Sequence, residues 1–188
     1  MPIDFFTSPC AKVDGNCKKA GVVCIRTTTA ERFGISDANS NRREPAFLDL
    51  DIDNEDIWDL IVENKPPKEV TFKAVDFCVD IFREELTATG QKQLIKRCEG
   101  FLKYDDKIVF IEIKNRRTGN WIVDSCEKFI ETIQQFRTSH PESGYNIMKP
   151  LIANKMHTGF HQSEMTQKRK LKDAIGLDFI ICSNWSID

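Results

Sequence analysis

RCEGFLKYDDKIVFIEIK, residues 97–114 of the chain, predicts two antiparallel strands joined by a tight turn. Residues 97–103 alternate in character as a half-buried strand does. Residues 104–107 carry turn chemistry, and residues 108–114 form a β-branched run interrupted by two charged residues. The stretch is therefore interpreted as a hairpin at the centre of the fold.

The register of this hairpin brings two acidic residues together. A turn with the two aspartates at its centre places Glu99 opposite Glu112 and Arg97 opposite Lys114. Directly opposed residues point to the same face, with Cβ atoms roughly 4.5–5.5 Å apart, and like charges there are destabilising. A cation between the acids, or a raised pKa on one of them, would resolve the repulsion. One face thus gathers two carboxylates and an ammonium, because Glu112 and Lys114 share it by the period of two.

These residues resemble the PD-(D/E)XK nuclease superfamily, the restriction-endonuclease-like proteins. The family signature is an acid on one core strand and acid-x-Lys on the adjacent antiparallel strand, matched here by Glu99 and by Glu112-Ile113-Lys114. The chain differs at Glu99, where the family usually has Asp. By element order, the resemblance covers roughly residues 70–183, and it implies a mixed α/β fold with a central antiparallel hairpin flanked by helices.

The resemblance implies a metal-dependent nuclease that hydrolyses phosphodiester bonds, most plausibly in DNA. Glu99 and Glu112 would hold Mg²⁺ or Mn²⁺, the hard cations that oxygen ligands favour. Lys114 would orient the attacking water and stabilise the developing negative charge. The residues themselves leave open DNA or RNA as substrate, and an endonuclease or an exonuclease as activity.

Composition places the chain among ordinary globular proteins. It has 188 residues, 40% of them hydrophobic and 30% charged, and a net charge of −2, which argues against indiscriminate nucleic-acid binding. No apolar run approaches the length of a membrane helix, and the seven cysteines include no CxxC pair, so we expect a cytoplasmic protein with reduced thiols. Cys10, Cys17 and Cys24 recur every seven residues, a spacing that favours isolated small hydrophobes over a zinc site.

A Lys-Pro-Pro break at residues 65–67 divides the chain into an N-terminal extension, 1–65, and a nuclease-like core, 66–188. In the extension, an acidic helix is predicted over 55–63. At the start of the core, the apolar spacing over 68–86 favours a helix, although the same run also suits a strand.

Further acidic and polar site residues are implied by the family's element order. Asp76 and Asp80 on the first core helix are candidate metal ligands, with a solvated helix face as the alternative. A strong amphipathic helix over 122–138 offers Gln134, or less favourably Gln135, as a residue facing the metal.

Basic residues supply candidate phosphate contacts. Arg116 and Arg117 follow Lys114 in a polar loop that ends at a tryptophan. A basic helix over 163–174 ends at a glycine and carries further candidates, Lys168, Arg169 and Lys170. The alternatives are a basic surface turn and a solvated helix. Residues 145–153 and 177–182 are predicted strands, the latter apolar enough for the centre of the sheet.

A second function class is consistent with the same residues. A nuclease-fold protein could bind a protein partner as an immunity or accessory module and cleave nothing, and the acidic stretch 49–59 would suit a basic partner. In that case Lys114 would neutralise the two glutamates without a metal. A cysteine-based zinc regulator is the third alternative for the function. For the assembly, a homodimer is an alternative to a protein partner.

Overall fold

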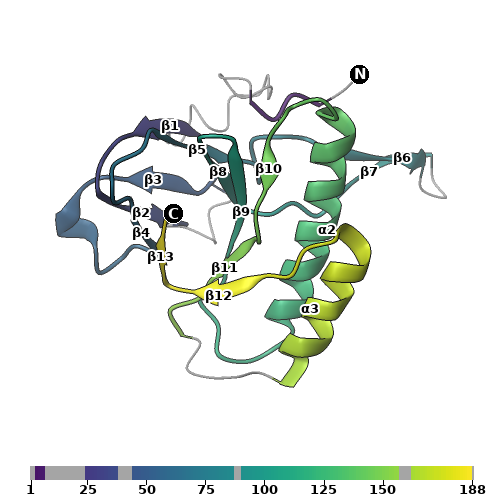
Figure 1. The fold of residues 1–188 in the computed structure, drawn as a ribbon. Coiled ribbons are helices and arrows are strands. Elements are labelled where there is room, and N and C mark those ends of the chain that lie inside the picture. Colours follow the sequence, from purple (N-terminus) through teal and green to yellow (C-terminus); the bar gives the residue numbers. More distant parts are fainter. Residues whose placement is uncertain (1–2, 7–23, 38–43, 87–89, 157–161, 188) are drawn as a thin grey trace.

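The computed structural model describes residues 3–6, 24–37, 44–86, 90–156 and 162–187. A mixed sheet forms the centre of the fold, with strands in the order β1-β5-β8-β9-β11-β12 and with β10 pairing beside β9. A second sheet has the order β13-β4-β2-β3, and β6 pairs with β7 in a separate hairpin. The helices α2 and α3 lie on one side of the central sheet and the second sheet on the other (Figure 1).

The strands of the central sheet have the bounds β1 Ile25–Thr28, β5 Val70–Ala74, β8 Gly100–Tyr104, β9 Lys107–Ile113, β10 Asn146–Ile147, β11 Leu151–Ala153 and β12 Ile180–Cys182. Those of the second sheet are β2 Arg32–Ser36, β3 Phe47–Asp49, β4 Leu60–Glu63 and β13 Asn184–Ser186. The remaining elements are a 3₁₀ turn η1 Ile52–Asn54, β6 Phe82–Leu86, β7 Lys92–Leu94, α2 Trp121–Ser139 and α3 Gln162–Ile175.

The predicted hairpin is confirmed in its register. Lys103 pairs with Ile108 and Gly100 with Ile111, as a turn with Asp105 and Asp106 at its centre requires. The strand is shorter than predicted, because β8 begins only at Gly100. The expected pairing of Arg97 with Lys114 does not form.

Alternation along the hairpin separates two environments. On one face, Phe101 and Phe110 pack with Phe136 of α2, at ring distances of 6.3 and 5.5 Å. On the other face, Tyr104 contacts Trp185 of β13 in the second sheet. Residues of β9 with even numbers therefore face α2, and those with odd numbers face the second sheet.

Two predicted helices are wrong. The run over 68–86 forms β5, a turn and β6, since the buried side chains of β5 align in a strand that hydrogen-bonds to both β1 and β8. The predicted helix over 55–63 is the turn after η1 followed by β4, whose buried and half-buried residues alternate. In both places pairing with neighbouring strands overrides a local helical signal, which is apolar spacing over 68–86 and an acidic first turn over 55–63.

The later elements agree more closely with the sequence. The helices predicted over 122–138 and 163–174 are α2 and α3, and Gly176 follows α3 with a φ of 80°. The strands predicted over 145–153 form on either side of Pro150, as β10 and β11. The strand predicted over 177–182 is wrong in its position, because β12 lies at the edge of the central sheet and Ile180 is exposed.

The segment before residue 66 shares sheets with the segment after it. β1 pairs with β5, and β4 pairs in parallel with β13 at the end of the chain. The fold class is thus mixed α/β. None of the helices that the structure describes has the length and apolarity to cross a membrane.

Gly100 allows the close approach of β5 to β8. A Cβ atom at this position would lie 2.5 Å from the Lys73 carbonyl oxygen and 2.8 Å from the Phe72 ring. We predict that Gly100→Ala lowers the free energy of unfolding by about 1–3 kcal/mol, because backbone cannot yield as a side chain can. Urea unfolding measures this value. Lys103→Ala on the same strand is the control, with an expected change of about 0.5 kcal/mol or less; an equal effect of both variants would contradict the prediction.

Candidate functional site: two buried glutamates around a lysine

Glu99 and Glu112 lie together on the face of the hairpin that α2 covers. Glu112 is fully buried near the end of β9, and Glu99 is 6% exposed immediately before β8. The amine of Lys128, from α2, lies 2.7 Å from Glu112 Oε1 and 3.5 Å from Glu99 Oε1. The sequence predicts the acid pair, and the structure supplies Lys128 as its shared cation.

Lys114 is on the same face, as its spacing from Glu112 predicts. Its amine lies 2.9 Å from Glu112 Oε1 and 3.0 Å from Asp124 Oδ2. Asp124 and Lys128 are one turn apart on α2, so the helix contributes one acid and one base to the cluster. Lys96 lies beyond them at the surface and bridges Asp124 and Glu127.

Burial dominates the electrostatics of the acid pair. It raises the pKa of Glu99 well above its usual range, and the charge of Glu112 raises it further. Burial also raises the pKa of Glu112, although Lys128 and Lys114 oppose this. Burial alone would lower the pKa of Lys128, but the two glutamates outweigh it and raise the pKa above its ordinary value. The cluster therefore keeps the Lys128 ammonium against the two carboxyl groups.

One carboxylate oxygen of the pair is unused. Glu112 Oε2 is buried and has no hydrogen-bond partner among the described residues. An unsatisfied buried carboxylate oxygen is unfavourable, and an ordered water or an ion beside it would satisfy it. The described residues contain no group of three or more His, Cys, Asp or Glu side chains in a metal-binding arrangement.

Asp76 and Asp80 are held by an arginine. Arg97 is 6% exposed and donates to Asp76 at 2.9 Å, to Asp80 at 3.2 Å and to the Val79 carbonyl. They lie on the turn between β5 and β6, where a helix was predicted. Asp76 is close enough to Glu99 to raise its pKa.

Gln134 does not lie beside Glu99 and Glu112. It is exposed on α2, and at 3.6 residues per turn its direction differs from that of Lys128 by about 120° around the helix axis. The alternative, Gln135, lies on the same side of α2 as Lys128 but two turns further along. The residues that α2 presents to the pair are Lys128 and Asp124.

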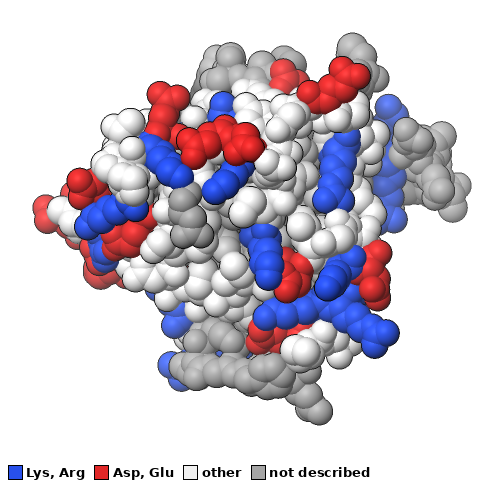
Figure 2. Space-filling model, viewed as in Figure 1, with Lys and Arg blue, Asp and Glu red and all other residues white. Residues whose placement is uncertain are grey.

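The basic candidates are at the surface. Arg116 and Arg117 are exposed just after Lys114. On α3, Arg169 and Lys170 are exposed, whereas Lys168 pairs with Glu164 and lies over the Phe179 ring. Figure 2 shows Lys and Arg side chains gathered over α3, with acidic side chains between them.

The N-terminal segment contributes two acids that the sequence does not place at the site, Asp37 and Asp59. Asp37, at the end of β2, has its pKa raised to about 6 by burial and by the charges of Asp59 and Glu112. Asp59 is 5% exposed and accepts from the Asp37 N–H and from Asn115. No local signal marks Asp37, because it comes at the start of a loop-like stretch far from the hairpin in sequence.

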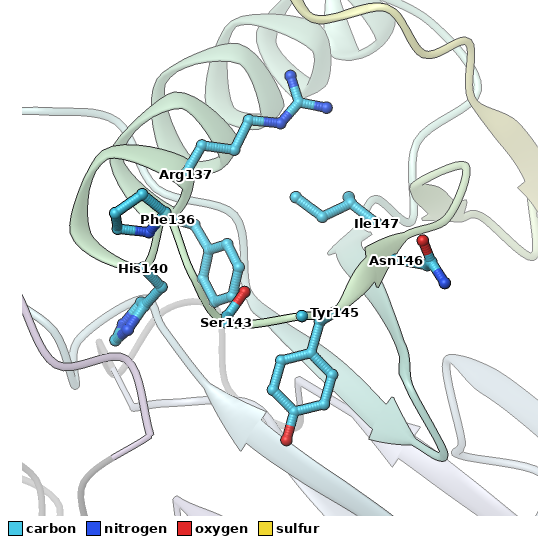
Figure 3. Close-up of a pocket in the computed structure, with 9 residues that line it drawn as sticks. Phe136, Arg137, His140, Ser143, Tyr145, Asn146 and Ile147 are labelled. Carbon is cyan, nitrogen blue, oxygen red and sulfur yellow. The ribbon is translucent and has the colours of Figure 1, made fainter.

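The cysteine site receives no support. Cys24 is buried and its Sγ accepts from the Lys73 amine at 3.6 Å, and Cys10 and Cys17 lie outside the described residues. A separate hollow of about 420 Å³ lies between the end of α2 and β10, lined among others by Phe136, Arg137 and Tyr145 (Figure 3). None of the residues that line it belongs to the acid cluster.

We predict that Lys128→Met lowers the free energy of unfolding by about 3–5 kcal/mol, because it removes the cation that Glu99 and Glu112 share and leaves Glu112 with Lys114 alone. Lys96→Met is the matched control, since it removes a half-exposed lysine that also bridges two acids, at an expected cost of about 0–1 kcal/mol. Chemical unfolding of both variants checks the difference. Equal effects would show that Lys128 does not neutralise the pair.

We predict that Asp37 titrates with a pKa of about 6 in the folded protein. Because this pKa is raised, the stability that Asp37 contributes is present below its unfolded pKa and is lost as the pH rises through 6. Asp37→Asn should therefore gain stability relative to wild type above pH 6 and match it near pH 4. Carboxyl NMR titration measures the pKa, and an unshifted value would contradict the prediction.

Comparison with protein-family models, with curated proteins and with solved structures finds no match for this chain. Its function is therefore inferred from its own residues: two buried acids that share one amine, a second amine beside them, and exposed arginines immediately after it.

Proposed function

We propose that the chain is a metal-dependent nuclease that hydrolyses phosphodiester bonds, with DNA as the favoured substrate. The observation that carries the proposal is the hairpin register, which brings Glu99 and Glu112 to one amine and leaves Lys114 beside Glu112. This is the relative placement that the PD-(D/E)XK signature requires. A hairpin with only a structural role gains nothing from two buried acids in opposition.

The order of elements supports the same proposal. After the antiparallel pair β8 and β9, the chain forms α2, then β11 parallel to β9, then α3 and β12 parallel to β11. Hairpin, helix, strand, helix, strand in one mixed sheet is the order that the resemblance implies. The helix expected before the hairpin is absent from the described residues, and β5 takes its place.

The donor set fits Mg²⁺ or Mn²⁺. Mg²⁺ is commonly held by one or two carboxylates, with waters and substrate phosphates completing its shell, so a third acidic ligand is not required. Glu99 and Glu112 would supply the carboxylates, and the free Oε2 of Glu112 is an oxygen available for this role. Lys128 would have to move away from the pair when a cation binds, because like charges repel.

When bound, the metal ion would supply an activated water and neutralise charge on the attacked phosphate. Lys114 donates to Glu112 and Asp124, so its amine is oriented from two sides and is placed to hold a water or a phosphate oxygen. Lys128 would stabilise negative charge on the same face. Arg116 and Arg117 would contact the nucleic-acid backbone, with Arg169 and Lys170 of α3 as a further basic surface.

One observation favours the second candidate, a nuclease-fold protein that binds a partner and cleaves nothing. Lys128 already resolves the repulsion between the glutamates, as a metal-free cluster would. The acidic stretch is less available to a basic partner than its sequence suggests. Asp49 and Asp59 are buried and used internally, while Asp51, Asp53 and Asp56 are exposed.

The nuclease proposal is tested by metal binding and cleavage together. We predict that calorimetry detects Mn²⁺ or Mg²⁺ binding by the wild type and not by Glu112→Gln. Linear and circular DNA should be cut only with the metal, and Lys114→Met should lower the rate about 10²-fold or more, since it removes the group that orients the water.

Glu127→Gln is the control for these variants, because Glu127 is a partly exposed acid of α2 that pairs with Lys96. It should bind metal and cleave as the wild type does. A wild type that shows neither metal binding at millimolar concentration nor cleavage would contradict the nuclease proposal. The second candidate, a nuclease-fold protein that binds a partner and cleaves nothing, would then remain.

A further inference from the structure

Asp59 joins three segments that are distant in sequence. Its Oδ2 accepts a hydrogen bond of 2.7 Å from the backbone N–H of Asp37, at the end of β2. Its Oδ1 accepts one of 2.5 Å from Asn115 Nδ2, and Asn115 directly follows Lys114. The carboxylate, 5% exposed, therefore links the second sheet to the end of β9.

The same end of β9 is held from its other side. Asn154, just after β11 and 3% exposed, donates through Nδ2 to the Arg116 carbonyl at 2.8 Å. Its Oδ1 accepts from the Met156 N–H at 2.9 Å, so both ends of the amide are used. The residues that precede the exposed Arg117 are thus held by two buried polar side chains, Asp59 before β4 and Asn154 after β11.

A third contact ties the same regions together. Lys155 donates from its amine to the Asp56 carbonyl at 2.9 Å, which joins the turn before β4 to the segment after β11. The ends of β9 and β11 therefore both contact the chain between η1 and β4. Asp37 is brought against the acid cluster by this arrangement, close enough for Glu112 and Lys128 to influence its carboxylate.

A stabilising role alone does not explain Asp59. It takes part in no salt bridge of the described part of the chain, and its hydrogen-bond donors are neutral. A buried carboxylate without a cation carries a large desolvation cost, and a neutral amide could accept from the Asp37 N–H at lower cost. A charged Asp59 carboxylate would, however, hold its two donors, the Asp37 N–H and Asn115 Nδ2, in charge-assisted hydrogen bonds, which are stronger than neutral ones.

We propose that Asp59 is a positioning residue, which holds the loop formed by residues 115–117 so that Arg116 and Arg117 face a nucleic-acid backbone beside Lys114. The second sheet is then a wall of the site. This inference rests on the proposed nuclease function. It adds to that function the residue that holds the substrate-binding loop in place.

An exchange of the two side chains tests the contact. Asn115→Asp places a second carboxylate against Asp59, and the two should repel and free the loop. In the double variant D59N/N115D the amide stands at 59, where its oxygen can accept from the Asp37 N–H and its nitrogen can donate to the carboxylate at 115. Both hydrogen bonds and the net charge are then those of the wild type.

Two readouts separate the contact from the function. Hydrogen exchange at the Asp37 amide should be faster in N115D and return to the wild-type rate in the double variant. The KM for cleavage of a DNA duplex should rise about tenfold in N115D, equivalent to ~1.4 kcal/mol, and return to within about threefold in the double variant. The value of kcat should change less than KM, since Lys114 keeps its contacts with Glu112 and Asp124.

Asn115→Ala removes the hydrogen bond without adding charge, and it should raise KM in the same direction if N115D fails to fold. A wild type that cuts DNA while N115D and N115A leave KM unchanged would overturn the positioning role. The positioning role would also be overturned if the double variant regained the wild-type exchange rate at the Asp37 amide but kept the raised KM. A wild type that neither binds nor cuts the duplex would instead overturn the proposed function, and with it the role of this loop.

Discussion

The repulsion between Glu99, immediately before β8, and Glu112, on β9, is the constraint around which this structure is arranged. Glu99 and Glu112 cannot avoid one another, because Gly100 pairs with Ile111 and sets the register of the strands. Both are almost wholly buried, so solvent does little to screen them. The amine of Lys128 provides the compensation, and α2 must lie across this face of the sheet for that amine to reach both acids.

The parts of the site that lie on one hairpin could be predicted from sequence. A period of two and a two-residue turn are sufficient to place Glu99, Glu112 and Lys114 on one face, because the geometry of paired strands is regular. Lys128 was missed although α2 itself was predicted, since the sequence shows which side of the helix is apolar and not which polar residue at its margin meets the sheet. The same uncertainty explains the choice of Gln134, which is exposed.

The errors and omissions in the fold have a common physical cause. The helical spacing over 68–86 competes with pairing to β1 and β8, and long-range pairing decides the outcome. Asp37 and Asp59 join the site through contacts across the second sheet, and nothing near them in sequence indicates where those contacts lie. The segment 1–65, which its sequence presents as an extension, thereby contributes Asp37 beside the acid cluster. The charge of Glu112 helps to raise the pKa of Asp37.

A crystal structure of the protein with Mn²⁺, with anomalous scattering to locate the ion, tests the central claim most directly. The account predicts an anomalous peak with oxygens of both Glu99 and Glu112 about 2.0–2.2 Å away, and the Lys128 amine displaced from between them. A structure at millimolar Mn²⁺ with no peak at the pair, and with Lys128 still bridging the glutamates, would contradict it.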